Sequence, residues 1–205
     1  MPSFELSDFL ARSTDVAFDE TALAKILKDL PALSKDGPWI AGGALRRTLL
    51  GREPESDFDF FFRDQEQLAA FTAALERDGF VKVRETTHHV HYRGKVNGAG
   101  VDRDIQCIRF AFYANSAAVI DSFDYTICQL AYDGKDLTLG EFTLWDLGRK
   151  RLAIHKLTYP VATMRRMLKY AQQGFTACAG CMATILKETA SKPEILEQLG
   201  VTYVD

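Results

Sequence analysis

The spacing of apolar and polar residues along the chain predicts a series of helices. Apolar residues recur at helical spacing over about 19–30, 44–50 and 65–77, and over most of the chain after Tyr159. Asp19 is a preferred residue at a helix N-terminus, so we expect the first helix to begin there. Helices therefore occur at both ends of the sequence and between the strands described next.

Short runs rich in β-branched and aromatic residues predict strands between these helices. They are WIA at 39–41, DFDFFF at 57–62, FVKVRET at 80–86, HHVHYRG at 88–94 and DIQCIRFAFY at 104–113. The glycines and asparagine of KVNGAG at 95–100 predict a turn. Strands mixed with helices first, and helices alone later, indicate an α+β protein. We predict a head with an N-terminal helix over 1–156 and a helical neck or C-terminal extension over 157–205.

The composition is that of an ordinary globular protein. The chain has 205 residues, 47% of them hydrophobic and 26% charged, so it is long enough to bury a core. Its net charge of -3 excludes a polycation that coats nucleic acid. The N-terminus lacks the features of a signal peptide, and no run of eighteen apolar residues occurs. We expect a soluble, cytoplasmic protein with no membrane partner.

The four cysteines are expected to be reduced thiols, because a soluble intracellular protein rarely keeps disulfides. Cys178 and Cys181 form a CxxC pair, a spacing found in redox and zinc sites. The pair lies in a helical stretch of small residues without a second such pair, so we interpret both as buried small side chains.

Positive charge gathers in one part of the sequence. Between Phe142 and Phe175 there is one acid, Asp146, and seven basic residues: Arg149, Lys150, Arg151, Lys156, Arg165, Arg166 and Lys169. This segment suits a ligand that carries phosphate, and solvated helix faces are the alternative explanation for each of these residues.

The stretch WIAGGALRRTLLGREPESDFDFFF, residues 39–62, carries the candidate chemistry. Side chains alternate along a strand, so Asp57 and Asp59 are expected on one face while Phe58 and Phe60 lie on the other. Two neighbouring carboxylates repel each other unless a cation lies between them. Hard oxygen ligands on a rigid strand suit Mg²⁺, with Mn²⁺ as an alternative. We therefore predict a metal site at Asp57 and Asp59.

The glycine pair before this strand indicates a phosphate site. Gly42 and Gly43 allow close approach of a ligand to the backbone, and the amides that open the next helix are donors for phosphate oxygens. Arg46, one turn into that helix, adds a charged donor. A metal site beside a phosphate site is the arrangement that nucleotidyl transfer requires.

The same stretch resembles the head signature of CCA-adding enzymes and bacterial poly(A) polymerases, members of the polymerase β nucleotidyltransferase superfamily. Their pattern of Gly-Gly, two residues, Arg, a Leu-Leu-Gly turn and Asp-x-Asp is matched at Gly42, Gly43, Arg46, Gly51, Asp57 and Asp59. Arg47 stands where that family commonly has Asp. The resemblance implies a polymerase β-type head, a mixed sheet with flanking helices, followed by a helical neck.

Two later segments continue the resemblance. FDYTICQLAYDG at 123–134 is similar to a nucleotide-contacting motif of the family, with Asp124 and Thr126 on matching positions. MLKYAQQGF at 167–175 is similar to the neck helix, and Arg166 matches an arginine before it. The resemblance thus implies that Asp124, Thr126 and Arg166 bind the nucleotide.

The sequence departs from the family at the third catalytic acid. The best alignment puts Gln106 at that position, and Asp104, two residues earlier on the same strand face, is the expected substitute. The base-reading Glu-Asp-x-x-Arg motif and room for tRNA-gripping tail domains are also missing, so CCA addition itself is not expected. His89 and His91 share a strand face and suit zinc, but a polar cluster is the alternative because no third ligand is evident.

The resemblance implies a Mg²⁺-dependent nucleotidyltransferase that binds a nucleoside triphosphate such as ATP. Asp57, Asp59 and Asp104 would be catalytic, and the acceptor would be an RNA end, a small molecule or a protein hydroxyl. One alternative is a catalytically weak or inactive nucleotide-binding sensor or regulator, which Gln106 favours. Another is a structural or interaction protein that keeps the two aspartates as a relic.

Overall fold

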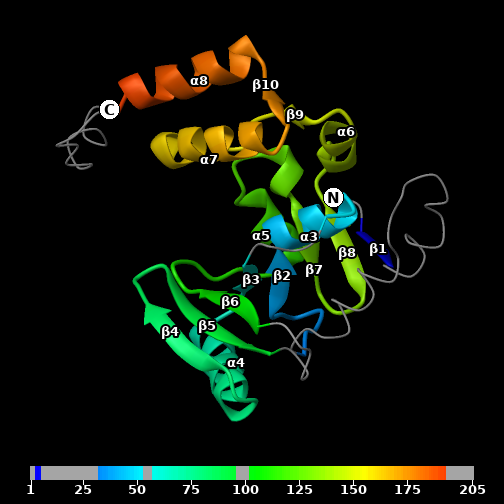
Figure 1. Cartoon of the computed structure of the whole chain (residues 1–205), viewed down its shortest axis with the longest axis vertical. Helices are drawn as coiled ribbons and strands as arrows, with labels where there is room; N and C mark the ends of the chain where they lie inside the picture. Colours follow the sequence, from blue (N-terminus) through cyan, green and yellow to red (C-terminus); the bar gives the residue numbers. More distant parts are fainter. Residues whose placement is uncertain (1–2, 6–31, 53–56, 96–101, 193–205) are drawn as a thin grey trace. The chain divides into compact units, whose positions relative to one another are not determined.

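The chain divides into two compact units in a computed structural model that describes residues 3–5, 32–52, 57–95 and 102–192. Unit 1 comprises residues 1–122 and 128–141, and unit 2 comprises residues 123–127 and 142–205 (Figure 1). Unit 2 thus includes a short segment, residues 123–127, that lies in the sequence between the two parts of unit 1. None of the helices in the described part of the chain has the length and apolar character of a membrane-spanning helix.

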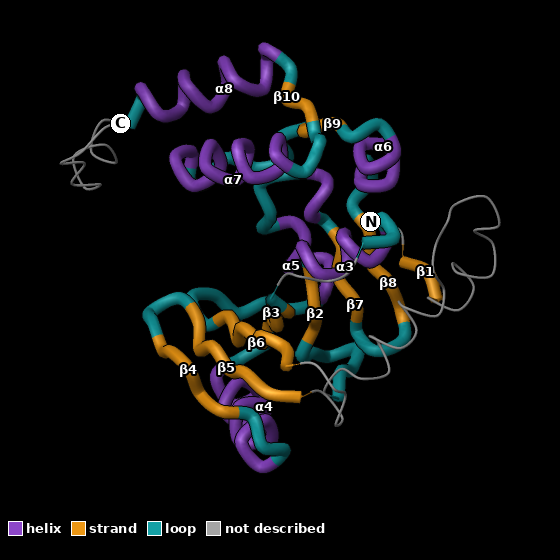
Figure 2. The backbone as a smooth tube through the Cα atoms, viewed as in Figure 1, coloured by secondary structure: helices purple, strands orange, loops and turns teal. Residues whose placement is uncertain are grey.

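An eight-stranded mixed sheet forms unit 1. Its strands are β1 (Ser3–Glu5), β2 (Trp39–Ala41), β3 (Phe58–Phe61), β4 (Val81–Glu85), β5 (His89–Lys95), β6 (Asp102–Ile108), β7 (Leu130–Tyr132) and β8 (Asp136–Leu139). Their order across the sheet is β1-β8-β7-β2-β3-β6-β5-β4 (Figure 2). The β3–β6 pair is parallel and the other pairs are antiparallel. β3, which carries the acidic motif, is therefore a central strand.

Among the described residues, three helices accompany the sheet: α3 (Gly43–Leu49), α4 (Gln65–Arg77) and α5 (Ser116–Asp121). α4 begins at Asp64, whose side chain accepts a hydrogen bond from the Gln67 amide at 2.8 Å. Phe71 of α4 packs on Phe60 and Phe62, with ring centroids 4.8 and 5.3 Å apart. This aromatic cluster anchors one face of β3 in the core of unit 1.

Unit 2 is mostly helical. It contains most of the 3-10 helix η2 (Thr126–Cys128), and also α6 (Thr143–Gly148), β9 (Arg151–Leu152), α7 (Pro160–Gln172), β10 (Thr176–Ala177) and α8 (Ala179–Ala190). α7 and α8 pack against each other, and β9 pairs with β10 in parallel. Tyr125 is fully buried; its hydroxyl donates to the Thr163 carbonyl, and its ring meets that of Tyr170 edge-on. This contact ties the segment 123–127 to α7.

The α+β class with a mixed sheet and a helical C-terminal part is confirmed. The predicted helix at 65–77 coincides with α4, whereas the strand predicted over 104–113 ends at Ile108. Beyond it the chain leaves the ladder, and the Tyr113 amide donates to the Phe62 carbonyl instead. The helix expected over 19–30 and most of the turn expected over 95–100 lie outside the described residues. The division at residue 156 stays a prediction.

The two cysteines of the CxxC pair differ in exposure. Cys181 is buried as expected, and burial raises the pKa of its thiol. The expectation for Cys178 is wrong, because its side chain is exposed and its sulfur accepts from the Cys181 amide at the start of α8. The CxxC spacing therefore places the Cys178 sulfur where it accepts a hydrogen bond at the N-terminus of α8.

Replacing Phe60 tests the aromatic anchor of β3. Phe60 is 0% exposed, so Phe60→Ala is expected to lower the free energy of unfolding by about 3–5 kcal/mol. Phe110→Ala is the matched control, because Phe110 is 53% exposed and its loss is expected to cost less than about 1 kcal/mol. Urea unfolding followed by circular dichroism measures both, and equal losses would contradict the packing described.

Candidate active site

Asp57, directly before β3, and Asp59 lie on one side of the strand, and Phe58 and Phe60 lie on the other. Phe58 and Phe60 are buried, whereas Asp57 and Asp59 are partly exposed. The alternation predicted from the sequence is thus present, because the apolar face is fixed by the core. The polar face of β3 presents both carboxylates side by side.

Gln106 stands beside these carboxylates. It pairs in register with Asp59 on the neighbouring parallel strand, and its side-chain amide donates a hydrogen bond to Asp57 Oδ2. An amide carries no charge and cannot add a third carboxylate to the pair. Instead its N–H group satisfies one oxygen of Asp57.

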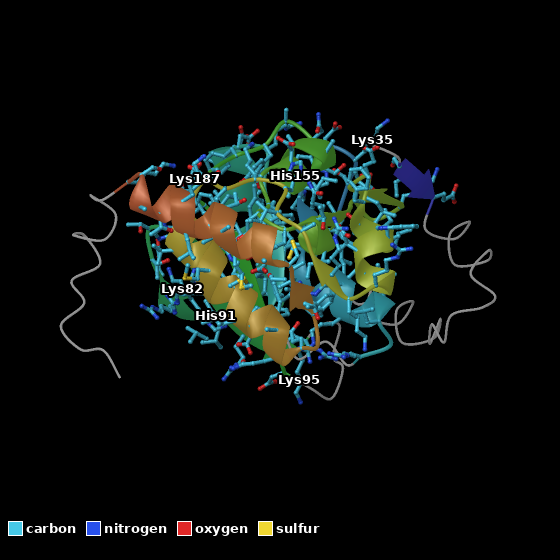
Figure 3. All side chains as sticks on the ribbon, turned by 90° about the horizontal axis from the view of Figure 1, so that it is seen from above. Lys35, Lys82, His91, Lys95, His155 and Lys187 are labelled. Atoms are coloured by element: carbon cyan, nitrogen blue, oxygen red, sulfur yellow. The ribbon has the colours of Figure 1, made fainter. Side chains whose placement is uncertain are left out.

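Asp104 is held by two side chains of β5. Arg93 donates to both of its carboxylate oxygens at 2.9 and 3.0 Å, and His91 Nε2 lies 2.7 Å from Oδ1 (His91 is labelled in Figure 3). The hydrogen bonds from Arg93 hold the pKa of Asp104 below its usual value. Asp104 is therefore an ionised carboxylate at neutral pH, engaged by a guanidinium and an imidazole.

The histidines contribute polar groups to the same sheet face. His91 pairs in register with Gln106, so Asp59, Gln106 and His91 form one row across three strands. Burial lowers the pKa of His89, and the nearby charge of His91 lowers it further. The described residues include no group of three His, Cys, Asp or Glu side chains placed to hold a metal. The polar-cluster interpretation of His89 and His91 stays a prediction.

The glycine turn joins β2 to α3. Gly42 has φ 83° and ψ −124°, a backbone conformation that side chains with a Cβ rarely adopt, and it precedes the first residue of α3, Gly43. Ala41, just before the turn, pairs with Asp59 on β3. The turn and the acidic strand are therefore neighbours at the same end of two paired strands.

Arg46 lies in the interior of unit 1. Its side chain is 2% exposed, and Nη1 donates to the Cys128 sulfur at 3.2 Å. Cys128 is one of the positions at which this sequence departs from the resembled motif. The sequence suggested a phosphate-facing Arg46, and only the structure revealed its sulfur partner.

Asp124 and Arg166 form an ion pair in unit 2. Arg166 Nη1 donates to Asp124 Oδ2 at 2.6 Å, and Asp124 is 9% exposed while the Arg166 side chain remains about half exposed. These two predicted nucleotide-binding residues, 42 positions apart in sequence, are thus brought together. Asp124 is nearly buried, so this ion pair is part of the internal structure of unit 2.

Thr126 has a structural partner in the same unit. Its hydroxyl donates to Asp146 Oδ2 at 2.6 Å, and Arg151 Nε lies 3.2 Å from Asp146 Oδ1. Asp146 is 1% exposed, and sequence reasoning noted it only as an isolated acid. Its place at the start of a predicted basic segment gave no signal that it is buried.

The predicted site residues fall into two sets, one in each unit. Unit 1 holds the two metal-site aspartates with Gln106, Asp104 and the glycine turn, and unit 2 holds Asp124, Thr126 and Arg166. Each set has its own internal contacts. The pairing of Asp104 with His91 and Arg93 was missed from the sequence, because it depends on the register of β5 against β6.

The donor set of unit 1 suits a divalent cation held jointly with a ligand. Mg²⁺ sites in nucleotide enzymes commonly use one or two carboxylates, with phosphate oxygens and water supplying the remaining positions. Asp57 and Asp59 meet the first requirement, since both are partly exposed and share a face of a rigid central strand. The residues present therefore fit such an ion with two protein ligands.

Solved structures of CCA-adding enzymes share this fold. The Thermotoga maritima CCA-adding enzyme complexed with tRNA is 18% identical in sequence, with a TM-score of 0.60 over 97% of this chain and 48% of that chain. A CCA-adding enzyme in complex with CTP, also 18% identical, has a TM-score of 0.61 over 96% of this chain and 48% of its own. The polymerase β-type fold suggested by the sequence is thereby confirmed.

Sequence relatives point to a more specific group. The protein described as Gabija anti-defense 2 from Bacillus phage SPbetaL7 is 27% identical over 154 residues, which cover 71% of this chain and 35% of that protein. The chain thus spans about a third of this relative and about half of the CCA-adding enzymes. The model of the Gabija anti-defense 2 family matches residues 12–150, well over half of the chain. The chain belongs to the Gabija anti-defense 2 (Gad2) family.

Proposed function

We propose that the protein is a divalent-metal-dependent nucleotidyltransferase that moves a nucleoside monophosphate from a nucleoside triphosphate to an acceptor hydroxyl. The observation that carries this proposal is the pair Asp57 and Asp59 on the polar face of a central strand, beside the glycine turn at Gly42. The shared fold with CCA-adding enzymes supports it. Neither feature alone implies transfer, but together they match its requirements for metal and phosphate.

In this proposal the glycine turn and the aspartates bind different parts of the substrate. The amides after Gly42 and Gly43 bind the outer phosphates, and Arg46 contributes positive charge from the interior. Asp57 and Asp59 hold Mg²⁺ or Mn²⁺. When bound, such an ion neutralises phosphate charge and polarises the reacting phosphoryl group.

The chemical step is an in-line displacement at the α-phosphorus. The acceptor oxygen forms a bond to phosphorus as the bond to the β-phosphate bridging oxygen breaks, and pyrophosphate leaves with the released electron pair. The hydroxyl proton is released to water. Asp104 is engaged by Arg93 and His91, so we assign it a positioning role, in which it orients the His91 imidazole on the same sheet face as Asp59.

Asp124, Thr126 and Arg166 of unit 2 are a separate part of the proposal, which rests on their match to the resembled motifs. The half-exposed Arg166 guanidinium is oriented by Asp124 and is suited to hydrogen bonds with the nucleotide. Thr126 acts indirectly, because its hydroxyl is already bonded to Asp146 and secures the segment that carries Asp124. The division into a head at 1–156 and a neck at 157–205 stays a proposal, in which Asp124 and Thr126 belong to the head and Arg166 to the neck.

The acceptor is an RNA end, a small molecule or a protein hydroxyl, and the family description points to Gabija defence as the process that the transfer counters. A second candidate function is nucleotide binding without turnover. The specific observation that favours it is Gln106, whose amide occupies the place of a third carboxylate and bonds to Asp57. Transfer assays separate these two functions.

Removing either aspartate charge is expected to abolish transfer. With α-labelled triphosphates, Mg²⁺, and separate bacterial RNA, protein and small-molecule fractions as acceptors, the native protein labels one fraction and releases pyrophosphate. Asp57→Asn and Asp59→Asn lower that label at least about a hundredfold, because each removes a metal ligand. Asp78→Asn, which changes an acid at the C-terminus of α4, is the control and keeps full labelling.

The fold of both variants is expected to persist, because the two carboxylates repel each other when no cation is bound. Thermal unfolding checks this. Full labelling by either variant would reject the assignment. Mg²⁺-dependent nucleotide binding with no labelled fraction and no pyrophosphate would favour the binding-only function.

A third carboxylate at position 106 tests the metal site without any substrate. Gln106→Glu replaces the hydrogen bond to Asp57 with charge repulsion, so the melting temperature falls in the presence of EDTA. Adding Mg²⁺ raises the melting temperature of this variant more than that of the native protein, because three carboxylates bind the cation more tightly. Differential scanning calorimetry at several Mg²⁺ concentrations measures the shift, and no Mg²⁺ response in the variant would contradict the site.

Arg166 and its neighbour Arg165 provide a matched test of the nucleotide contacts in unit 2. Both are exposed arginines of α7, but only Arg166 is paired with Asp124. Arg166→Ala is expected to weaken nucleotide binding about tenfold, the effect of losing one charged hydrogen bond, while Arg165→Ala leaves it unchanged. Calorimetric titration with each of the four triphosphates and Mg²⁺ measures both, and equal affinities would remove Arg166 from the site.

A further inference from the structure

The short helix α6 in unit 2 turns its aromatic side chains toward solvent. Phe142, Trp145 and Arg149 follow one another at intervals of three and four residues, so they lie along one side of the helix. Phe142 is 56%, Trp145 55% and Leu144 45% exposed, whereas Thr143, Asp146 and Leu147 are buried. The largest apolar side chains of this helix are therefore the ones left outside the core, which marks an interaction surface.

Arg149 and Trp145 form a stacked pair on this surface. The guanidinium carbon of Arg149 lies 3.6 Å from the centre of the Trp145 ring, a close cation–π contact. Stacking orders both side chains while leaving them exposed to solvent. The result is a flat platform that carries a positive charge.

The turn after α6 retains a lysine where glycine is preferred. Lys150 has φ 51°, and it is the only residue other than glycine with a positive φ among the described parts of the chain. This conformation costs about 1–2 kcal/mol for a residue with a Cβ. Its amide donates to the Leu147 carbonyl, and its carbonyl accepts from the Thr176 amide at 2.7 Å, so the conformation is held by the fold. Lys150 thus brings its positive charge from a backbone position that the fold fixes directly after Arg149.

Three consecutive exposed cations lie at and directly after the end of α6. Arg149, Lys150 and Arg151 are consecutive and exposed, and Arg151 also forms an ion pair with the buried Asp146. The surrounding segment from Phe142 to Phe175 is strongly basic, although the whole chain has a net charge of -3. The surface therefore combines ring faces with local positive charge.

We propose that this α6 platform, formed by Phe142, Trp145, Arg149 and Lys150, binds single-stranded nucleic acid. Unpaired bases stack on aromatic rings and on arginine planes, while the adjacent phosphates pair with the cations. A duplex hides its base faces, so it offers only phosphates to the same surface. This inference goes beyond the proposed transfer reaction and requires neither a metal nor a nucleoside triphosphate.

Intrinsic fluorescence reports directly on the platform. The chain has two tryptophans, and Trp39 is 0% exposed, so Trp145 is the residue that solutes reach. Titration of the full chain, in EDTA, with a single-stranded RNA of about twelve nucleotides is expected to quench the emission. An equal-length duplex and heparin, which carry negative charge without accessible bases, are expected to quench it far less.

Variants measured by anisotropy of the labelled single strand separate stacking from charge. Trp145→Ala is expected to raise the Kd about tenfold or more, and Trp145→Phe to restore most of the affinity. Lys150→Gly weakens binding and lowers the salt dependence of log Kd by about 0.7, while its melting temperature is unchanged or higher because the strain is removed. Leu186→Ala and Lys187→Ala on α8 (Lys187 is labelled in Figure 3) are exposed controls that keep native affinity.

Several results would overturn the proposal. No binding of single-stranded RNA or DNA would do so, as would a Kd that Trp145→Ala leaves unchanged. Equal binding of heparin would mean that the surface binds polyanions through its positive charge alone, without base stacking. Concentration-dependent self-association that Trp145→Ala removes, without nucleic-acid binding, would assign the platform to a second copy of the chain. None of these results bears on Asp57 and Asp59, because the assay contains EDTA.

Discussion

The two faces of β3 are the constraint on which the site depends. Phe58 and Phe60 are held in the core, the latter against Phe71 of α4, and strand geometry then obliges Asp57 and Asp59 to share the opposite face. The electrostatic cost of bringing two carboxylates together is thus imposed by hydrophobic packing. The same packing fixes the backbone positions from which the two carboxylates project, as the proposed cation site would require.

The charges around this pair are arranged differently from a three-carboxylate site. Gln106 supplies an N–H group to Asp57, and Asp104 is drawn into contacts with Arg93 and His91. Both arrangements reduce negative charge near Asp57 and Asp59. The pair is therefore easier to maintain without metal than three carboxylates would be, and it has fewer ligands to offer when metal is present.

Membership of the Gabija anti-defense 2 family and the polymerase β-type fold describe different levels of this protein. The fold explains how a glycine turn and an acidic strand come to be neighbours, while activity depends on the side chains placed there. The α6 platform belongs to unit 2 and the acidic strand to unit 1, so the two proposed sites depend on separate sets of contacts.

The sequence alone determined those features that rest on local spacing. The alternation of DFDF predicted which side chains share a face of β3, the apolar period predicted α4, and the order of strands and helices predicted the α+β class. Only the tertiary structure decided the contacts between distant segments. Arg46 meets Cys128, Asp124 meets Arg166, and Asp104 meets His91 and Arg93, because strand register and chain crossings bring together residues far apart in sequence. The exposure of Trp145 was likewise hidden, since the sequence does not state which side of a short helix the core will cover.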